Sequence, residues 1–460
     1  MTSHSVLKTP AEVTLARQFE EAVGDLPGTV AVRDLREAAF ARFAAKGLPH
    51  RRVEEWKYTD LKARIAEAAP LAVRTSATAL AEVAARPREI DGAIRLFVVD
   101  GTFHPEISDL AGLPEGLSIA ALADVLDAGR EDVLAVLTGL DIAKEDAALA
   151  LNTAFLRDGV VIDVADGAAI AAPVEIVHVV TPAHAVSVHS RVVVILGTGA
   201  KLGLVERFVS GDAGHQRSEV LQVITGDGAE LDHAAIKSDD RAALGLSTLT
   251  ATLGSNAKLA SFGLNSSGDL SRRQFFVRFD GDHAALNLSG ANLLSERMHS
   301  DVTLVVEHVG LAGVSRELYR YVIDGEASGV FQGKVIVRPG AQKTDGRMAS
   351  NALLLSDTAE MANKPELEIY ADDVACGHGA TCGAIDETPV FYLMSRGLPR
   401  ADAEALLIRS FVGEVVDGVA IGALEPAADA VRQGLDAAID VWLAGRSLGV
   451  AHSHQTKGRA

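Results

Sequence analysis

The middle of the chain, from Gly159 to about residue 376, alternates hydrophobic and polar residues. Short runs rich in valine and isoleucine are separated by turns of Gly, Asp and Ser, and the period within a run is two, as in ELEIYADDV at 366–374. This period is typical of a β-strand with one buried face. The longest apolar run, VVVIL at 192–196, is only as long as a strand. The section therefore predicts many short strands.

A turn motif, Gly-x-x-Ala-x-Leu, recurs in this section at steps of 29, 28 and 27 residues. It begins at Gly197, Gly226, Gly254 and Gly281, and glycines without the full motif continue the step at Gly310 and Gly340. A turn glycine, a small inward residue and an inward leucine, once in about 28 residues, are typical of stacked coils. We therefore expect the leucines of the motif to stack as equivalent inward rungs. These are Leu202, Leu231, Leu259 and Leu286.

The repeat favours a parallel β-helix or a similar β-solenoid. The alternative is a β-sandwich, but its turns would recur every 8–12 residues or so rather than every 28. Aromatic residues make up only 5% of the chain, which suits narrow coils filled by small and branched side chains.

Helical patterns flank the repeat on its N-terminal side. RDLREAAFARFAAKGLP predicts a helix that stops at Gly47 and Pro49, and residues 130–159 predict a second helical stretch. Between them, RLFVVDGTFHP predicts a strand and a turn. The region from 10 to 155 is thus expected to be mostly, but not entirely, helical.

A pair of helices is predicted after the repeat, the first beginning at Pro399. Its apolar residues recur every four positions, at Leu407, Phe411, Val415 and Val419. The apolar side of the second helix carries Val431, Leu435, Ile439 and Trp442. Such a pair either caps the open end of a solenoid or offers a groove to a partner.

The net charge and the absence of targeting signals limit the classes of function that the sequence allows. The chain has 460 residues and a net charge of −19, which disfavours a sequence-independent grip on nucleic acid. We find no secretory signal and no apolar run long enough to span a membrane. Two cysteines without a signal favour free thiols in a reducing compartment. We therefore expect a cytoplasmic protein.

Familiar catalytic and nucleotide motifs are missing. GTGAKLG has the spacing G-x-G-x-x-x-G and is one turn of the repeat rather than a dinucleotide fingerprint. GVFQGKV at 329–335 is one residue short of a P-loop and lacks the Ser or Thr after lysine. Any nucleotide chemistry must come from another chain.

The stretch DDVACGHGATCG at 372–383 contains both cysteines, Cys376 and Cys382, and one histidine, His378. On a strand, Cys376 and His378 point to the same side, about 6–7 Å apart. Thiolate and imidazole bind iron or zinc, but a closed structural site needs four ligands and this stretch offers three. An open site shared with another subunit is better supported. The alternative is that Cys376 is an inward core residue, and for Cys382 we favour that alternative.

Long motifs resemble the SufB/SufD family of iron–sulfur cluster assembly scaffolds. The run from GVFQGKVIVRPG at 329 to SFVGEVV at 416 is similar to the C-terminal half of the family. LPHRRVEEWKYTDL and ALNTAFLRDGVVIDV are similar to its N-terminal region and its entry into the β-helix. The SufD branch is favoured, because SufB carries a Glu-His-Glu-Ala stretch and an N-terminal cysteine cluster, whereas this chain has GHGAT and no cysteine near its start.

The resemblance implies a mainly β fold, a right-handed parallel β-helix between helical ends. The expected boundaries are 1–157, 158–385 and 386–460. It also implies a non-enzymatic scaffold in a complex with SufB and the ATPase SufC, which would supply the ATP hydrolysis. In the family, the histidine that aligns with His378 faces a SufB cysteine where the nascent cluster is thought to form, and Cys376 aligns with the cysteine before it. SufD usually has an aliphatic residue at the position of Cys382, so no family role passes to that thiol.

The C-terminal helices would be the docking surface for SufC. The positions expected to take part are Leu407, Phe411, Val415 and Val419. No cofactor is expected to bind tightly to this chain alone; the resemblance leaves open whether flavin binds the complex and whether the isolated chain forms a homodimer.

Two alternatives come from other classes of protein. One is a β-helix carbohydrate-active enzyme, which would need paired acids in an exposed groove. The other is a stand-alone metal-binding protein built on Cys376, His378 and Cys382.

Overall fold

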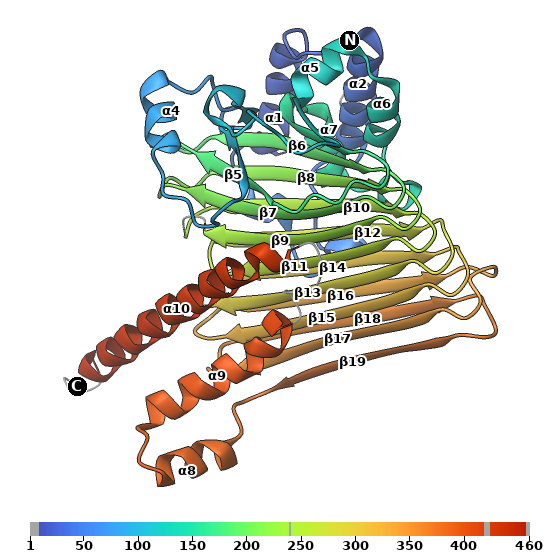
Figure 1. Cartoon of the computed structure of the whole chain (residues 1–460). Helices are drawn as coiled ribbons and strands as arrows, with labels where there is room; N and C mark the ends of the chain where they lie inside the picture. The colour runs from blue at the N-terminus through green and yellow to red at the C-terminus, as the bar shows by residue number, and fades with distance from the viewer. Residues whose placement is uncertain (1–8, 239–240, 418–423, 457–460) are drawn as a thin grey trace.

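Two sheets that face each other form most of the protein (Figure 1). The computed structural model describes residues 9–238, 241–417 and 424–456. In spatial order, the ten-stranded sheet contains β19 (Ala375–Gly383), β17 (Asp345–Leu354), β15 (Val314–Ile323), β13 (Ala285–Leu294), β11 (Lys258–Asn265), β9 (Glu230–Ser238), β7 (Lys201–Ser210), β5 (Val174–Val180), β1 (Ile94–Val99) and β2 (Thr102–Phe103). The nine-stranded sheet contains β18 (Glu360–Ile369), β16 (Ser328–Val337), β14 (His299–His308), β12 (Leu270–Phe279), β10 (Leu244–Leu253), β8 (Gln216–Thr225), β6 (Ser187–Leu196), β4 (Asp158–Val164) and β3 (Leu117–Ala121).

The chain alternates between the two sheets from β4 to β19, and from β6 on each strand pairs in parallel with the strand two places earlier. This winding confirms the predicted parallel β-solenoid. The predicted strand and turn near residue 95 are also confirmed, because β1 pairs in parallel with β5 and antiparallel with β2. β3 pairs antiparallel with β4.

The predicted leucine rungs stack as expected. Leu202 lies opposite Leu231, Leu231 opposite Leu259, and Leu259 opposite Leu286. All four side chains are buried in the same hydrophobic cluster between the two sheets. A solenoid with this continuous interior needs no large aromatic core.

The turn glycines of the repeat lie where one turn stacks directly on the previous one. A Cβ at Gly281 would overlap the backbone of Ser255 in the turn below, and one at Gly310 would overlap the backbone of Gly281. Close backbone approach, rather than flexibility, therefore requires glycine at these positions.

The N-terminal region places short helices over the first coils. They are α1 (Pro10–Ala22), α2 (Val30–Lys46), α3 (Leu61–Arg64), α4 (Ala77–Ala84), α5 (Leu122–Ala128), α6 (Glu131–Leu137) and α7 (Ala147–Ala154). α2 ends at the C-cap Gly47, as predicted. The second helical stretch is broken into α6 and α7, and Gly139 between them has a positive φ of 80°, which a continuing helix does not allow.

A single turn of 3₁₀ helix, Glu54–Trp56, fastens the N-terminal region to the outer face of the nine-stranded sheet. The guanidinium carbon of Arg272 lies 3.7 Å from the centroid of the Trp56 ring. Arg272 also donates a hydrogen bond of 2.7 Å to the carbonyl of Glu55. Glu54 forms an ion pair with Lys364 on β18. We call this turn the clamp, because it joins the start of the chain to distant coils.

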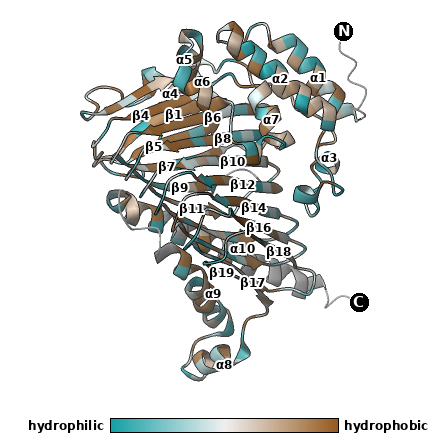
Figure 2. Ribbon diagram, turned by 90° about the vertical axis from the view of Figure 1, so that its right-hand side faces the viewer, coloured by the Kyte–Doolittle hydropathy of each residue, from teal (hydrophilic) through white to brown (hydrophobic). Residues whose placement is uncertain are grey.

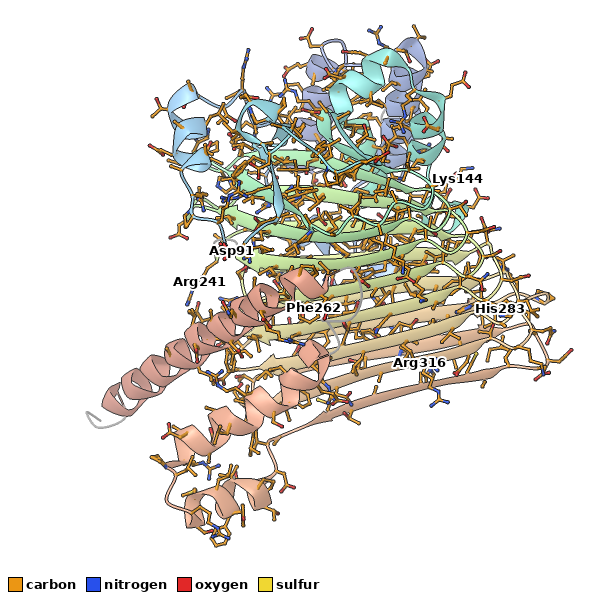
Figure 3. The ribbon with its side chains drawn as sticks, viewed as in Figure 1. Asp91, Lys144, Arg241, Phe262, His283 and Arg316 are labelled. Carbon is orange, nitrogen blue, oxygen red and sulfur yellow. The ribbon has the colours of Figure 1, made fainter. Side chains whose placement is uncertain are left out.

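The C-terminal helices are α8 (Glu387–Ser395), α9 (Arg400–Asp417) and α10 (Ala428–Thr456). Both α9 and α10 contribute to a cluster with outward residues of the ten-stranded sheet, among them Phe262, labelled in Figure 3. Of the two roles considered for these helices, the cap does not fit the described residues, because the helices cover the side of the solenoid rather than its end (Figure 1). α8 lies within the helical segment predicted for 386–460 but before the helical pair, whose start was placed at Pro399.

Hydropathy follows this architecture. Figure 2 shows strands β1, β4 and β6 as mostly hydrophobic, while hydrophilic residues gather in the turns. Among the described residues, no helix is long and apolar enough to cross a membrane.

Candidate functional site

The motif with both cysteines forms β19, the last strand of the ten-stranded sheet. Its only neighbour in the described part of the chain is β17, where Gly346 lies opposite Cys376, Met348 opposite His378, and Ala352 opposite Cys382. Met348 and Ala352 belong to the core between the sheets. The three side chains of the motif therefore occupy the inward phase of the strand, but no further coil covers them.

Their exposure reflects this position at the end of the solenoid. Cys376 is partly buried, whereas His378 and Cys382 are exposed. The core position favoured for Cys382 is therefore wrong, because no further coil of the described chain covers this part of the strand. The shared phase of Cys376 and His378 confirms the prediction made from the strand pattern. Both cysteines are free thiols, as predicted.

The motif is compact in sequence but extended in space. At about 3.3 Å per residue, Cys376 and Cys382 lie about 20 Å apart along the strand. Within the described ranges, no three His, Cys, Asp or Glu side chains are grouped so that they could hold a metal ion. The geometry therefore argues against a stand-alone metal site made of Cys376, His378 and Cys382.

Cys376 borders the core and the open end at once. It packs against the hydrophobic cluster between the sheets, and burial raises the pKa of its thiol. Gly346 opposite it is not needed for space, because a Cβ there would lie at ordinary contact distance, 3.6 Å from the Cys376 Sγ and 3.5 Å from the Ser315 Oγ. The position of Cys376 therefore allows both of its predicted roles, an inward core residue and a ligand of a shared site.

A buried carboxyl group beneath the site was missed in the sequence. Glu317 on β15 lies in register with Met348 and, one strand further, with His378. Among the described residues neither of its carboxyl oxygens has a partner with good hydrogen-bond geometry, and burial raises its pKa to about 8 although the nearby Ser315 hydroxyl opposes the shift. The period-two pattern of VSRELYRYVI could have placed Glu317 inward, because it has the same phase as the buried Tyr319 and Tyr321.

The open end of the solenoid also exposes apolar side chains. β18 ends the other sheet, and Met361 and Leu367 on it are only partly buried against the core. Ile369 is 41% exposed and Tyr370 is 56% exposed. Two unpaired strand edges beside exposed apolar residues are typical of a surface that pairs with another chain.

The predicted docking residues of the first C-terminal helix do not share one environment. Val415 is buried against the sheet, and Phe411 is partly buried beneath the guanidinium of Arg320, whose carbon lies 4.6 Å from the ring centroid. Leu407 is also partly buried, and Val419 lies outside the described residues. Phe391 and Tyr392 on α8 are more exposed, at 74% and 57%.

Comparisons with known proteins cover nearly the whole chain. The family model described as SUF system FeS cluster assembly, SufBD core domain, matches residues 178–411, which are 234 of the 460 residues. The SufBD protein N-terminal region matches residues 18–176.

Curated relatives agree with the family models. The chain is 29% identical to the iron–sulfur cluster assembly protein SufD of Escherichia coli, over 81% of this chain and 86% of the relative. It is 28% identical to an iron–sulfur cluster assembly SufBD family protein of Synechocystis, over 85% and 88%. It is also 29% identical to SufD of Bacillus subtilis, over 58% and 66%.

These matches displace the carbohydrate-active alternative, because both parts of the chain match one family and the match includes the open end of the solenoid. The two family models therefore place the chain in the SufBD family of the SUF system for iron–sulfur cluster assembly, and its relatives in Escherichia coli and Bacillus subtilis make it a member of the SufD type.

Proposed function

We propose that this chain is a non-enzymatic scaffold subunit that helps to assemble iron–sulfur clusters in a complex with a SufB-like subunit and a SufC-like ATPase. The observation that carries the proposal is the open end of the solenoid, where an exposed His378 and a partly buried Cys376 lie on a strand with one unpaired edge. The same end exposes apolar residues that a second solenoid would cover. Membership of the SufBD family indicates the process in which the chain takes part, iron–sulfur cluster assembly.

His378 would be this chain's ligand in a site that the SufB-like subunit completes. Near pH 7 a neutral imidazole can bind a metal without first losing a proton, whereas burial raises the pKa of the Cys376 thiol. The nascent cluster is cargo in this proposal rather than a resident cofactor. The proposal includes neither flavin in the complex nor a homodimer of the isolated chain.

The test is co-expression of the chain with SufB-like and SufC-like partners, followed by purification and analysis of iron and acid-labile sulfide. We expect His378→Ala to leave the complex intact and to lower its iron and sulfide content at least tenfold. Cys382→Ser is the matched control, because Cys382 is exposed on the same face of the same strand. Normal cluster content with His378→Ala would overturn the shared site.

We further propose that the C-terminal helices receive the ATPase. Support comes from α8, where Phe391, Tyr392 and Met394 are exposed although they are large and apolar. Deleting residues 399–460 would be a poor test, since it would uncover Phe262 and its neighbours on the sheet. Point substitutions avoid this problem.

Phe391→Ala is therefore the better variant. We expect it to weaken binding of the SufC-like ATPase more than tenfold in titration calorimetry, without loss of the folded solenoid. Val441→Ala on α10 is the control, because Val441 and Phe391 are both 74% exposed. Unchanged affinity with Phe391→Ala would remove α8 from the docking surface but would leave the His378 site untouched.

A further inference from the structure

A chamber inside the solenoid is lined by charged residues as well as by hydrophobic ones. It lies between the C-terminal halves of β7 and β9 and the N-terminal halves of β8, β10 and β12, and its volume is about 20 Å³. Beside Thr248 and Gln274, whose phase is outward, its polar lining consists of Glu206, Glu219, His233, Lys237, Ser247 and Arg273. These residues have the inward phase of their strands, so the chamber lies within the protein and away from the open end.

Both carboxylates of this chamber are engaged by other side chains. Glu206 is hydrogen-bonded to His178 at 2.9 Å and to His233 at 3.0 Å, and these contacts hold its pKa well below the usual range. Glu219 pairs with Arg217 at 2.6 Å. Neither carboxylate forms an ion pair with Arg273.

Arg273 forms no ion pair with any of the described residues, although the Glu206 carboxylate attracts it through space. Its side chain crosses the interior, so that a Cβ at Gly263 on the opposite sheet would overlap its guanidinium. In the described part of the chain it forms no hydrogen bond or ion pair, and its recorded contact is with the ring of Phe275, 5.0 Å away. Burial lowers its pKa. A buried guanidinium without a hydrogen-bond acceptor destabilises the folded state, because no protein group replaces the water that hydrates it in the unfolded chain.

A second cation borders the same chamber. The Lys237 Nζ lies 3.5 Å from the hydroxyl of Ser271, which precedes Arg273 by one inward position on β12. Two cationic groups from opposite sheets therefore approach one small space. A cavity of this volume admits one water-sized particle, whereas the tetrahedral phosphate and sulfate anions are larger.

We propose that the chamber binds one monatomic anion of the chloride type, with Arg273 as its principal ligand and Lys237 as the second cation. The anion gives Arg273 the direct contact that neither Glu206 nor Glu219 makes with it, since Glu206 acts on Arg273 only through space. It also completes the interior of the coils formed by β7 to β12. This site is independent of the proposed role of His378, from which it is separated by the coils of β14 to β18.

Bromide is the probe for the first test, since it replaces chloride and scatters anomalously. Crystals of the full chain grown in sodium bromide should show a buried anomalous peak between Arg273 and Lys237. Absence of a peak in the interior of the wild-type protein, with density for water alone, would overturn the proposal.

Stability provides a second readout that does not need crystals. At constant ionic strength, replacing fluoride with chloride or bromide should raise the unfolding midpoint of the wild-type chain, because an anion that binds only the folded state stabilises it. Arg273→Gln should abolish this halide-specific rise, whereas Arg273→Lys should retain part of it. Should Arg273→Gln fail to fold, the halide-specific rise is compared between wild type and Arg273→Lys. A smaller rise in Arg273→Lys would support the site, and an equal rise would contradict it.

Arg278→Gln is the matched control. Arg278 is on the same strand but pairs with Asp280 and Glu307 on the outer face, so its loss should lower stability without changing the halide response. An equal halide response in wild type and Arg273→Gln would show that the ions act on the surface and would contradict the proposal.

Discussion

In the middle coils the inward positions of each strand are covered by a coil on either side, whereas β18 and β19 are covered on one side only. The same strand phase that buries Leu231 and Leu259 in the middle leaves His378 exposed at the end. The backbone hardly differs between the two regions, since both continue one parallel register. The difference shows that the site is created where stacking stops, and not by a special local fold.

The largest effect on stability is expected in the middle. Leu231→Ala should lower the free energy of unfolding by about 2–5 kcal/mol, because it removes a buried rung and leaves a cavity. Urea titration measures this loss. Cys382→Ala at the end is the comparison, and an equal cost at both positions would contradict the contrast between the two regions.

The next effect concerns Glu317, which lies between the two regions. Its pKa is raised from 4.5 to about 8 in the folded chain, so the folded state holds a proton that the unfolded state releases in this window. Its contribution to stability should therefore fall by about 1.4 kcal/mol per pH unit as the pH rises from 4.5 to 8. Glu317→Gln should flatten this decline.

Urea titrations of both proteins at several pH values across this window would measure the two slopes. Glu360→Gln, on the exposed part of β18, is the control and should leave the slope unchanged. Parallel slopes for wild type and Glu317→Gln would mean that Glu317 is ionised in the folded protein.

A smaller effect is expected at Cys376, which borders both regions. Cys376→Ser should cost about 1 kcal/mol, because a hydroxyl replaces a partly buried thiol at the edge of the core. Thermal unfolding would detect the change. A cost as large as that of Leu231→Ala would place Cys376 within the closed core instead.

The smallest effect on stability is expected at the open end itself. His378→Ala should change the free energy of unfolding by less than about 0.5 kcal/mol, since the exposed imidazole has little packing to lose. The same variant is the one expected to lose clusters in the assembled complex. A large loss of stability would make His378 a structural residue.

Much of the fold could be predicted because its signals are local and repeated. Each turn carries its own glycine and leucine, and strand parity alone placed Cys376 and His378 on one face. Val415 illustrates the limit: helical spacing showed an apolar face but not whether the sheet or a partner covers it.

The missed charges had a similar origin. Arg273 and Glu317 have inward phase, but only the assembled coils show what lies opposite each of them. Both side chains matter because the folded protein gives them no ion-pair partner among its described residues. The sequence cannot show this, because it does not say which groups meet in the folded chain. Long-range packing, rather than local propensity, decides such positions.

The clamp has a consequence for the order of events during synthesis. Glu55 precedes its partner Arg272 by 217 residues, and Glu54 precedes Lys364 by 310. A ribosome that adds about 5–20 residues each second needs at least ten seconds to deliver these partners. Until then the face of the Trp56 indole that stacks on Arg272 stays uncovered, although the indole can already pack in the hydrophobic cluster of the N-terminal region and donate a hydrogen bond to Asp146. The N-terminal region of a nascent chain can therefore pack on itself well before the clamp fastens it to the later coils.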